Sequence, residues 1–144
     1  GFRRLLGFVK PGVWEYEIEA ELMHEFLRNK SKGFAYTPII ASGNNANVLH
    51  YVVNNQQCKD GDLLLMDVAA EYANYSSDLS RTIPVNGKFT DRQKAVYQAV
   101  LRVKKEATKM LVPGTIWAEY HKEVGHLMTS ELLGLGLESA WKMM

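Results

Sequence analysis

The stretch MDVAAEYANYSSDLSRTIPVNG, from Met66 to Gly87, carries two aspartates in a pattern that predicts a β-hairpin. Asp67 stands in the apolar run Leu63–Ala70, which predicts a strand buried on both faces, and Asp78 follows a short polar break. Burying one ionised carboxylate without a partner costs several kcal/mol, and burying two side by side costs more. The hairpin therefore needs a group that neutralises two neighbouring negative charges.

The register of this hairpin decides whether the two carboxylates meet. A tip at Tyr72–Ala73 would place Asp67 directly opposite Asp78, because paired positions in an antiparallel hairpin have a constant sum. Their Cβ atoms would then lie about 5 Å apart on one face. A bulge, or a tip shifted by one residue, would change this pairing.

Three kinds of group can neutralise the pair: a shared proton, a basic side chain or a divalent cation. Arg81 is three residues past Asp78, so on a strand it points to the opposite face and is a poor partner. Each aspartate could bind one metal ion, or Asp78 could bridge two ions about 3.5–4 Å apart. In the alternative without metal, Asp78 is exposed and Asp67 accepts backbone hydrogen bonds. The spacing leaves both interpretations open.

Composition limits the classes of function. The 144 residues suffice for one domain with a real core. The formal net charge of +1 gives no basis for binding nucleic acid or an anionic membrane, and no apolar run is long enough to span a bilayer, so we predict neither partner. Cys58 is the single cysteine, which excludes an intrachain disulfide and favours a reducing, cytoplasmic location.

Hydrophobic periodicity and turn signals predict an α+β chain. Four helical segments are expected: the end of a helix in residues 1–10, then residues 14–29, 90–112 and 115–133. Four strands are expected in residues 36–41, 48–53, 63–70 and 75–85, with a loop at 42–47 and a turn at 59–62. Thr90 and Gln93 form a capping-box pattern at the start of the third helix.

Two segments of the chain resemble each other. PGVWEYEIEAELMHEF begins at Pro11 and PGTIWAEYHKEVGHLM begins at Pro113, and both open a helix with Pro-Gly, a Trp and a Glu. If the similarity is not chance, the chain holds one αβ unit and the opening helix of a second.

The segment LLLMDVAAEYANYSSDLSRTIPVNGKFT, residues 63–90, resembles the metal-binding hairpin of the aminopeptidase P group of pita-bread metallopeptidases. This superfamily also includes prolidases and methionine aminopeptidases, and it shares the Asp-x10-Asp spacing. The tail RTIPVNGKFT, followed by Gln93 and Tyr97, favours the aminopeptidase P group. The resemblance covers residues 7–137 and implies an incomplete pita-bread fold, with its first αβ unit and the opening helix of the second.

The resemblance implies a role for three residues. Asp67 matches an aspartate that binds one metal of a dinuclear, usually manganese, centre, and Asp78 matches the aspartate that bridges both metals. His50, in VLHY, matches an active-site histidine that contacts the substrate and stabilises the transition state. The implied reaction removes the first residue from peptides with proline in second position, by attack of a metal-bridging hydroxide on the first peptide bond.

The chain departs from the family pattern in its metal ligands. The family uses a further histidine and two glutamates, and His121 and His126 do not match that context. We therefore expect residues 1–144 to be part of a catalytic domain, without the amino-terminal domain and the later ligand-bearing strands, and inactive alone. An apolar sheet face left uncovered predicts self-association, and hence a homo-oligomer.

Two alternatives remain. A pita-bread module without catalysis could bind peptides or proteins, although such relatives have generally lost the metal ligands and this chain keeps Asp67 and Asp78. A prolidase-type dipeptidase would keep the chemistry and change the substrate.

Overall fold

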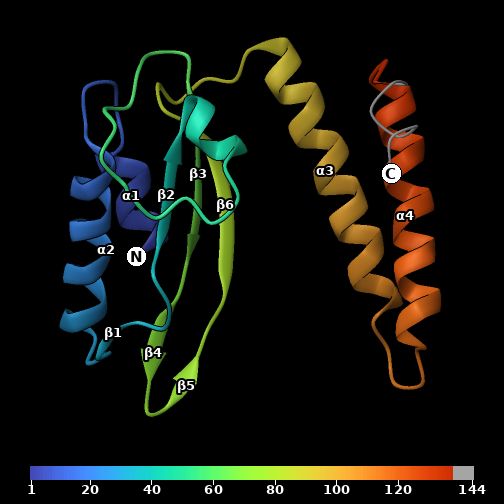
Figure 1. Ribbon diagram of the computed structural model, residues 1–144, viewed down its shortest axis with the longest axis horizontal. Helices are drawn as coiled ribbons and strands as arrows, with labels where there is room; N and C mark the ends of the chain where they lie inside the picture. The colour runs from blue at the N-terminus through green and yellow to red at the C-terminus, as the bar shows by residue number, and fades with distance from the viewer. Residues whose placement is uncertain (138–144) are drawn as a thin grey trace. The chain divides into compact units, whose positions relative to one another are not determined.

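The computed structural model describes residues 1–137, and the chain divides into two compact units (Figure 1). The first unit is Gly1–Lys88, and the second begins at Phe89. In each unit two helices follow one another through a Pro-Gly turn.

The first unit contains two helices, a short 3₁₀ helix and two small antiparallel sheets. Its elements are α1 (Phe2–Phe8), α2 (Glu15–Arg28), β1 (Gly33–Phe34), β2 (Ile39–Ser42), η1 (Gly43–Asn47), β3 (Leu63–Val68), β4 (Ala70–Tyr72), β5 (Tyr75–Ser76) and β6 (Leu79–Pro84). In the larger sheet β3 lies between β2 and β6. In the smaller sheet β4 lies between β1 and β5. The unit is α+β, as predicted.

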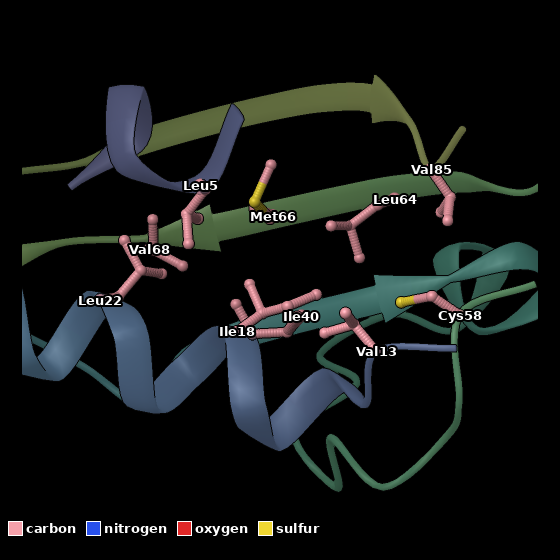
Figure 2. Close-up of a cluster of buried hydrophobic side chains, with 10 residues drawn as sticks. All are labelled: Leu5, Val13, Ile18, Leu22, Ile40, Cys58, Leu64, Met66, Val68 and Val85. Carbon is pink, nitrogen blue, oxygen red and sulfur yellow. The ribbon is translucent and has the colours of Figure 1, made fainter. Parts of the chain in front are cut away.

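The core lies between the two helices and one face of β3. Leu64 and Met66 of β3 are buried, and they face Leu5 of α1 and Ile18 and Leu22 of α2 (Figure 2). The alternate positions of β3 are only half-buried. The prediction that this strand is buried on both faces is therefore wrong, because the helices of the unit cover one face and leave the other open.

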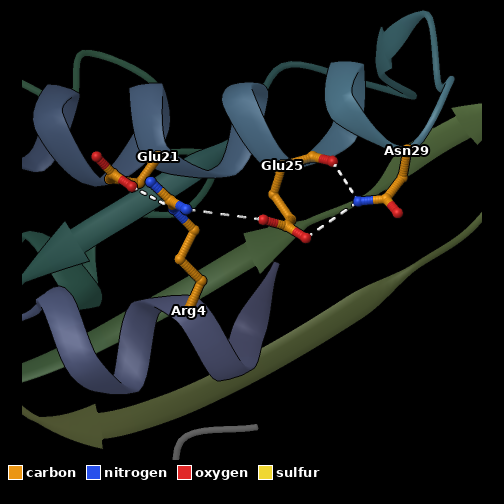
Figure 3. A network of polar contacts seen from close by, with 4 residues as sticks. All are labelled: Arg4, Glu21, Glu25 and Asn29. Carbon is orange, nitrogen blue, oxygen red and sulfur yellow. Dashed lines mark hydrogen bonds and ion pairs between the residues drawn. The ribbon is translucent and has the colours of Figure 1, made fainter.

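Polar contacts join α1 to α2 along their solvent side. Arg4 lies between Glu21 and Glu25 and forms an ion pair with each, and Asn29 donates to Glu25 at the end of α2 (Figure 3). These groups are partly exposed, so each ion pair contributes less than about 1 kcal/mol. The apolar contacts beneath them hold the helices.

The predicted strand at residues 48–53 is wrong, since this segment has no regular structure. Leu49 is 87% exposed and Val53 is 65% exposed, and Tyr51 is the buried apolar side chain of the run, so the run does not present the regular buried face of a strand. The predicted loop before it forms η1 instead. The predicted strand at 36–41 shortens to β2, which begins after Pro38, a residue with no N–H to donate.

The second unit is a pair of packed helices, α3 (Asp91–Met110) and α4 (Trp117–Gly134). The predicted capping box is confirmed: the Thr90 hydroxyl accepts from the Gln93 backbone N–H, and the Gln93 side chain accepts from the Thr90 N–H. Arg102 of α3 donates to both carboxylate oxygens of Glu131 of α4. None of the described helices is long and apolar enough to cross a membrane.

The two Pro-Gly segments share a local backbone as well as a sequence pattern. Gly12 has φ 95° and Gly114 has φ 94°, a conformation that costs glycine little. Each glycine lies three residues before the first residue of a helix, Glu15 in α2 and Trp117 in α4. The similarity between the two segments therefore extends from sequence to turn and helix start.

Candidate functional site

The hairpin turns one residue later than predicted. Glu71 pairs with Ser76 and Tyr72 with Tyr75, so the tip is Ala73–Asn74. Both tip residues have positive φ, 52° and 67°, as a two-residue type I′ turn requires. Asn adopts this conformation more readily than Tyr, which explains why the tip includes Asn74 rather than Tyr72.

This register changes the partner of Asp67. Asp67 pairs with Ser80, and Asp78 falls in the break between β5 and β6. The prediction that Asp67 lies directly opposite Asp78 is wrong. The two aspartates are instead diagonal neighbours, which remain within reach of a shared ligand.

Tyr36 brings the two carboxylates together. Its hydroxyl oxygen lies 2.6 Å from Oδ1 of Asp67 and 3.1 Å from Oδ1 of Asp78. Tyr36 is three residues before Ile39, the β2 residue paired with Asp67, which places the ring beside the aspartates. Partial burial and the two carboxylates raise the pKa of Tyr36 above its usual value. One hydroxyl has one proton, so it can donate to only one carboxylate at a time.

The two carboxylates are less buried than the sequence suggested. Asp67 is half-buried and Asp78 is exposed. Arg81 pairs with Met66, whose side chain is on the core face, and it donates to the Ser80 carbonyl at 2.7 Å. The exclusion of Arg81 as a partner agrees with this arrangement. Asp78 is exposed, as the interpretation without metal expected, but Asp67 accepts from a tyrosine hydroxyl.

His50 lies apart from any metal-ligand cluster in the described part of the chain. It is exposed, it follows η1 on the irregular segment, and its φ is 54°. Within residues 1–137, no three His, Cys, Asp or Glu side chains gather closely enough to hold a metal ion. The structure thus brings together Asp67 and Asp78 of the predicted site residues, with Tyr36 added.

Glu15, which the sequence analysis did not single out, is the most elaborately bonded side chain of the first unit. It is 0% exposed, and its carboxylate accepts five hydrogen bonds from Ser42, Asn45, Tyr51 and Gln56. Burial alone would raise the pKa of Glu15, but these donors outweigh burial and lower it.

Sequence spacing contained a signal for Glu15. It is three residues before Ile18 and seven before Leu22, so it shares their buried stripe on α2. A carboxylate in phase with a core stripe must find donors, which makes it a structural or functional centre. Tyr36 had no comparable signal, because its position depends on the pairing of β2 with β3.

Comparison with known proteins places these residues in a family. The model of metallopeptidase family M24 matches residues 1–141. The Xaa-Pro aminopeptidase of Haemophilus influenzae is 40% identical over 137 residues, which cover 95% of this chain and 32% of that protein. The Xaa-Pro dipeptidase of Rattus norvegicus is 39% identical over 142 residues, which cover 95% of this chain and 29% of that protein.

A solved structure gives the same result. A variant of Escherichia coli aminopeptidase P matches with a TM-score of 0.91 and 40% identity, over 94% of this chain and 31% of that one. The chain thus spans 29–32% of the length of these relatives. The match confirms the resemblance and the expected fold, an incomplete pita-bread fold. The chain belongs to metallopeptidase family M24.

Proposed function

We propose that the protein carrying this chain is a metal-dependent aminopeptidase that removes the first residue from peptides with proline in second position. The observation that carries the proposal is the pair of carboxylates, Asp67 and Asp78, held at one hydroxyl in a chain of a metallopeptidase family. Relatives named Xaa-Pro aminopeptidase support the substrate class.

The donor set fits a divalent metal. Carboxylate oxygens are ligands that Mn²⁺ and similar hard cations prefer. Two negative charges meet at Tyr36 with a single proton between them, so a cation would relieve their repulsion. We assign Asp67 to one of two divalent ions, most simply Mn²⁺, and Asp78 to both. A zinc-substituted Escherichia coli aminopeptidase P is among the similar structures.

Bound metal would lower the pKa of a water and polarise the peptide carbonyl. The residues of this chain have separate tasks. Asp67 and Asp78 supply negative charge, and the Tyr36 hydroxyl, which lies beside both carboxylates, orients one of them at a time by donating its proton. His50, exposed and without a strand around it, would contact the substrate and donate a hydrogen bond to the developing oxyanion.

Location and assembly are part of the same proposal. Cys58 is buried and free, which fits a reducing compartment such as the cytoplasm. Large apolar side chains are exposed on the second unit, among them Val100, Ile116 and Trp117. Such a surface favours contact with further parts of the protein or with a second copy.

A dipeptidase is the second candidate, because Xaa-Pro dipeptidases are 37–39% identical to this chain. The test uses the purified complete protein with Mn²⁺ and three peptides: Ala-Pro-Ala, Ala-Pro and Ala-Ala-Ala. We expect the protein to release alanine from Ala-Pro-Ala. This activity should be lost when the metal is chelated and should return when Mn²⁺ is added. Cleavage of Ala-Pro alone would indicate the dipeptidase. Absence of any cleavage with bound Mn²⁺ would contradict the proposal and favour a binding module.

Replacement of Tyr36 with Phe is expected to weaken Mn²⁺ binding by roughly tenfold, since groups that orient metal ligands typically contribute this much. The change removes one oxygen and keeps the ring. Calorimetric titration with Mn²⁺ measures the effect. Tyr75→Phe is the matched control, because Tyr75 is 82% exposed at the hairpin tip and its loss of hydroxyl should leave affinity unchanged. Equal Mn²⁺ affinities in the two variants would show that Tyr36 does not contribute to metal binding.

A further inference from the structure

The segment that carries His50 has no regular secondary structure to fix its conformation. Residues 48–56 form no helix and no strand, and the nearest pairing is a single bridge between Gln57 and Trp14. His50 and Asn54 both have positive φ, 54° and 48°. Leu49 is 87% exposed. His50 is itself exposed, and the segment is joined to the fold by the buried Tyr51 beside it and by the Gln56 carbonyl, which accepts from the Glu15 backbone N–H at 3.0 Å.

The Glu15 carboxylate supplies further support. Its Oε2 accepts from the Tyr51 hydroxyl at 2.7 Å and from the Gln56 backbone N–H at 3.0 Å. Its Oε1 accepts from the Ser42 N–H at 2.8 Å, the Ser42 hydroxyl at 2.7 Å and the Asn45 amide at 3.1 Å. These donors both precede and follow His50 in the chain, and Tyr51 is its direct neighbour.

Asn54 gives the segment a second attachment, in part through Glu19, which lies one turn after Glu15 on α2. Its side chain accepts from the Ile40 N–H at 3.0 Å and donates to the Pro38 carbonyl at 3.0 Å and to Glu19 at 2.8 Å. It is 3% exposed, so these bonds are protected from water. Asn54 thus fastens the far end of the segment to the edge of β2 and to α2.

We propose that Glu15 is a positioning residue for His50, acting through Tyr51 and the two ends of the segment. The inference rests on the proposed function, in which His50 contacts the substrate. All five groups around the carboxylate donate, so the site requires an acceptor at both oxygens. An amide at this position would present N–H to donors, break contacts on one side and shift His50. Glu15 itself touches neither substrate nor metal in this account.

Glu15→Gln in the complete protein tests the proposal, because it keeps the shape of the side chain. We expect kcat for a Xaa-Pro peptide to fall on the order of a hundredfold, the effect of a misplaced catalytic group. Bound manganese should stay at the wild-type level. His50→Ala should likewise lower kcat with metal retained. Glu17→Gln is the matched control, since Glu17 is exposed on the same turn and glutamine preserves its cap on Trp14.

The double variant decides the mechanism. If Glu15 acts through His50, adding Glu15→Gln to His50→Ala should change kcat by less than about twofold. Independent, multiplying effects would overturn the proposal, and so would a normal kcat in Glu15→Gln. If Glu15→Gln does not fold, Tyr51→Phe in the same cycle replaces it, since it removes only one donor. A wild-type protein without activity on any Xaa-Pro peptide would refute the proposed function instead.

Discussion

Replacement of Asp78 with Asn is expected to abolish manganese-dependent turnover in the protein that carries this chain. A neutral amide is a poor bridging ligand, and a catalytic metal contributes several kcal/mol to the transition state. Because about 1.4 kcal/mol corresponds to a tenfold change in rate, kcat should fall by about a thousandfold or more. Steady-state hydrolysis of Ala-Pro-Ala, with metal content measured on the same sample, gives the result.

The fold should survive this change. Asp78 is exposed and shares the Tyr36 hydroxyl with Asp67, so removing its charge also removes a repulsion. The melting temperature without metal should therefore be equal to that of the wild type or higher. Asp91→Asn, at an exposed helix start, makes the same charge change away from the pair and should keep full activity. An active Asp78→Asn variant would contradict the assignment of this residue.

Replacement of Glu15 with Ala is expected to destabilise the first unit strongly. It leaves the buried donors of Ser42 and Tyr51, and the partly buried donors of Asn45 and Gln56, without their acceptor. A buried donor that loses its acceptor costs about 1–3 kcal/mol, and several donors lose theirs here, so the variant should lose several kcal/mol. Urea unfolding of the complete protein measures the loss.

A control on the same helix separates burial from charge. Glu21→Ala also removes a carboxylate from α2, but this carboxylate is partly exposed and pairs with Arg4 at the surface. Its loss should cost less than about 1 kcal/mol. If both variants lose equal stability, the buried network around Glu15 is not the reason.

The Glu15 carboxylate should also determine how the stability of the protein changes in acid. The pKa of Glu15 is lowered in the folded state, so its contribution is present above the unfolded pKa and is lost as pH falls through the lower folded value. Wild-type stability should therefore drop in acid below about pH 4.5, the ordinary pKa of glutamate. Glu15→Gln should be less stable at neutral pH and should show a flatter acid limb. Parallel curves would mean that Glu15 does not titrate as described.

Local patterns were sufficient for most helices. The stripe through Ile18 and Leu22 gave α2 to within one residue at each end, and the Thr90 capping box gave the start of α3. These features depend on neighbours three or four residues away, which the sequence displays directly.

Features set by tertiary contacts were predicted less well. The apolar run at residues 48–53 was predicted as a strand but forms none. Its Tyr51 hydroxyl donates to Glu15, and Asn54, just beyond the run, bonds to the backbone of Pro38 and Ile40. The hairpin register depended on which two residues could adopt positive φ, and the choice fell on Ala73 and Asn74. Pattern alone did not distinguish that tip from the adjacent one.

The arrangement of the two aspartates was predicted in part. Spacing indicated that Asp67 and Asp78 share a face, and the structure brings them together by a diagonal rather than a direct pairing. Tyr36 was not predicted because it reaches the pair only through the packing of β2 beside β3. The role of His50 came from family resemblance, since nothing in its local sequence distinguishes it from a surface histidine.

The central claim is that Asp67 and Asp78 hold metal. Anomalous diffraction from manganese-loaded crystals of the complete protein tests it most directly, because the signal locates the ions independently of activity. The account predicts anomalous density in contact with the carboxylates of both aspartates, beside the Tyr36 hydroxyl. Manganese bound elsewhere, with neither aspartate in contact, in a protein that cleaves Xaa-Pro peptides would contradict it.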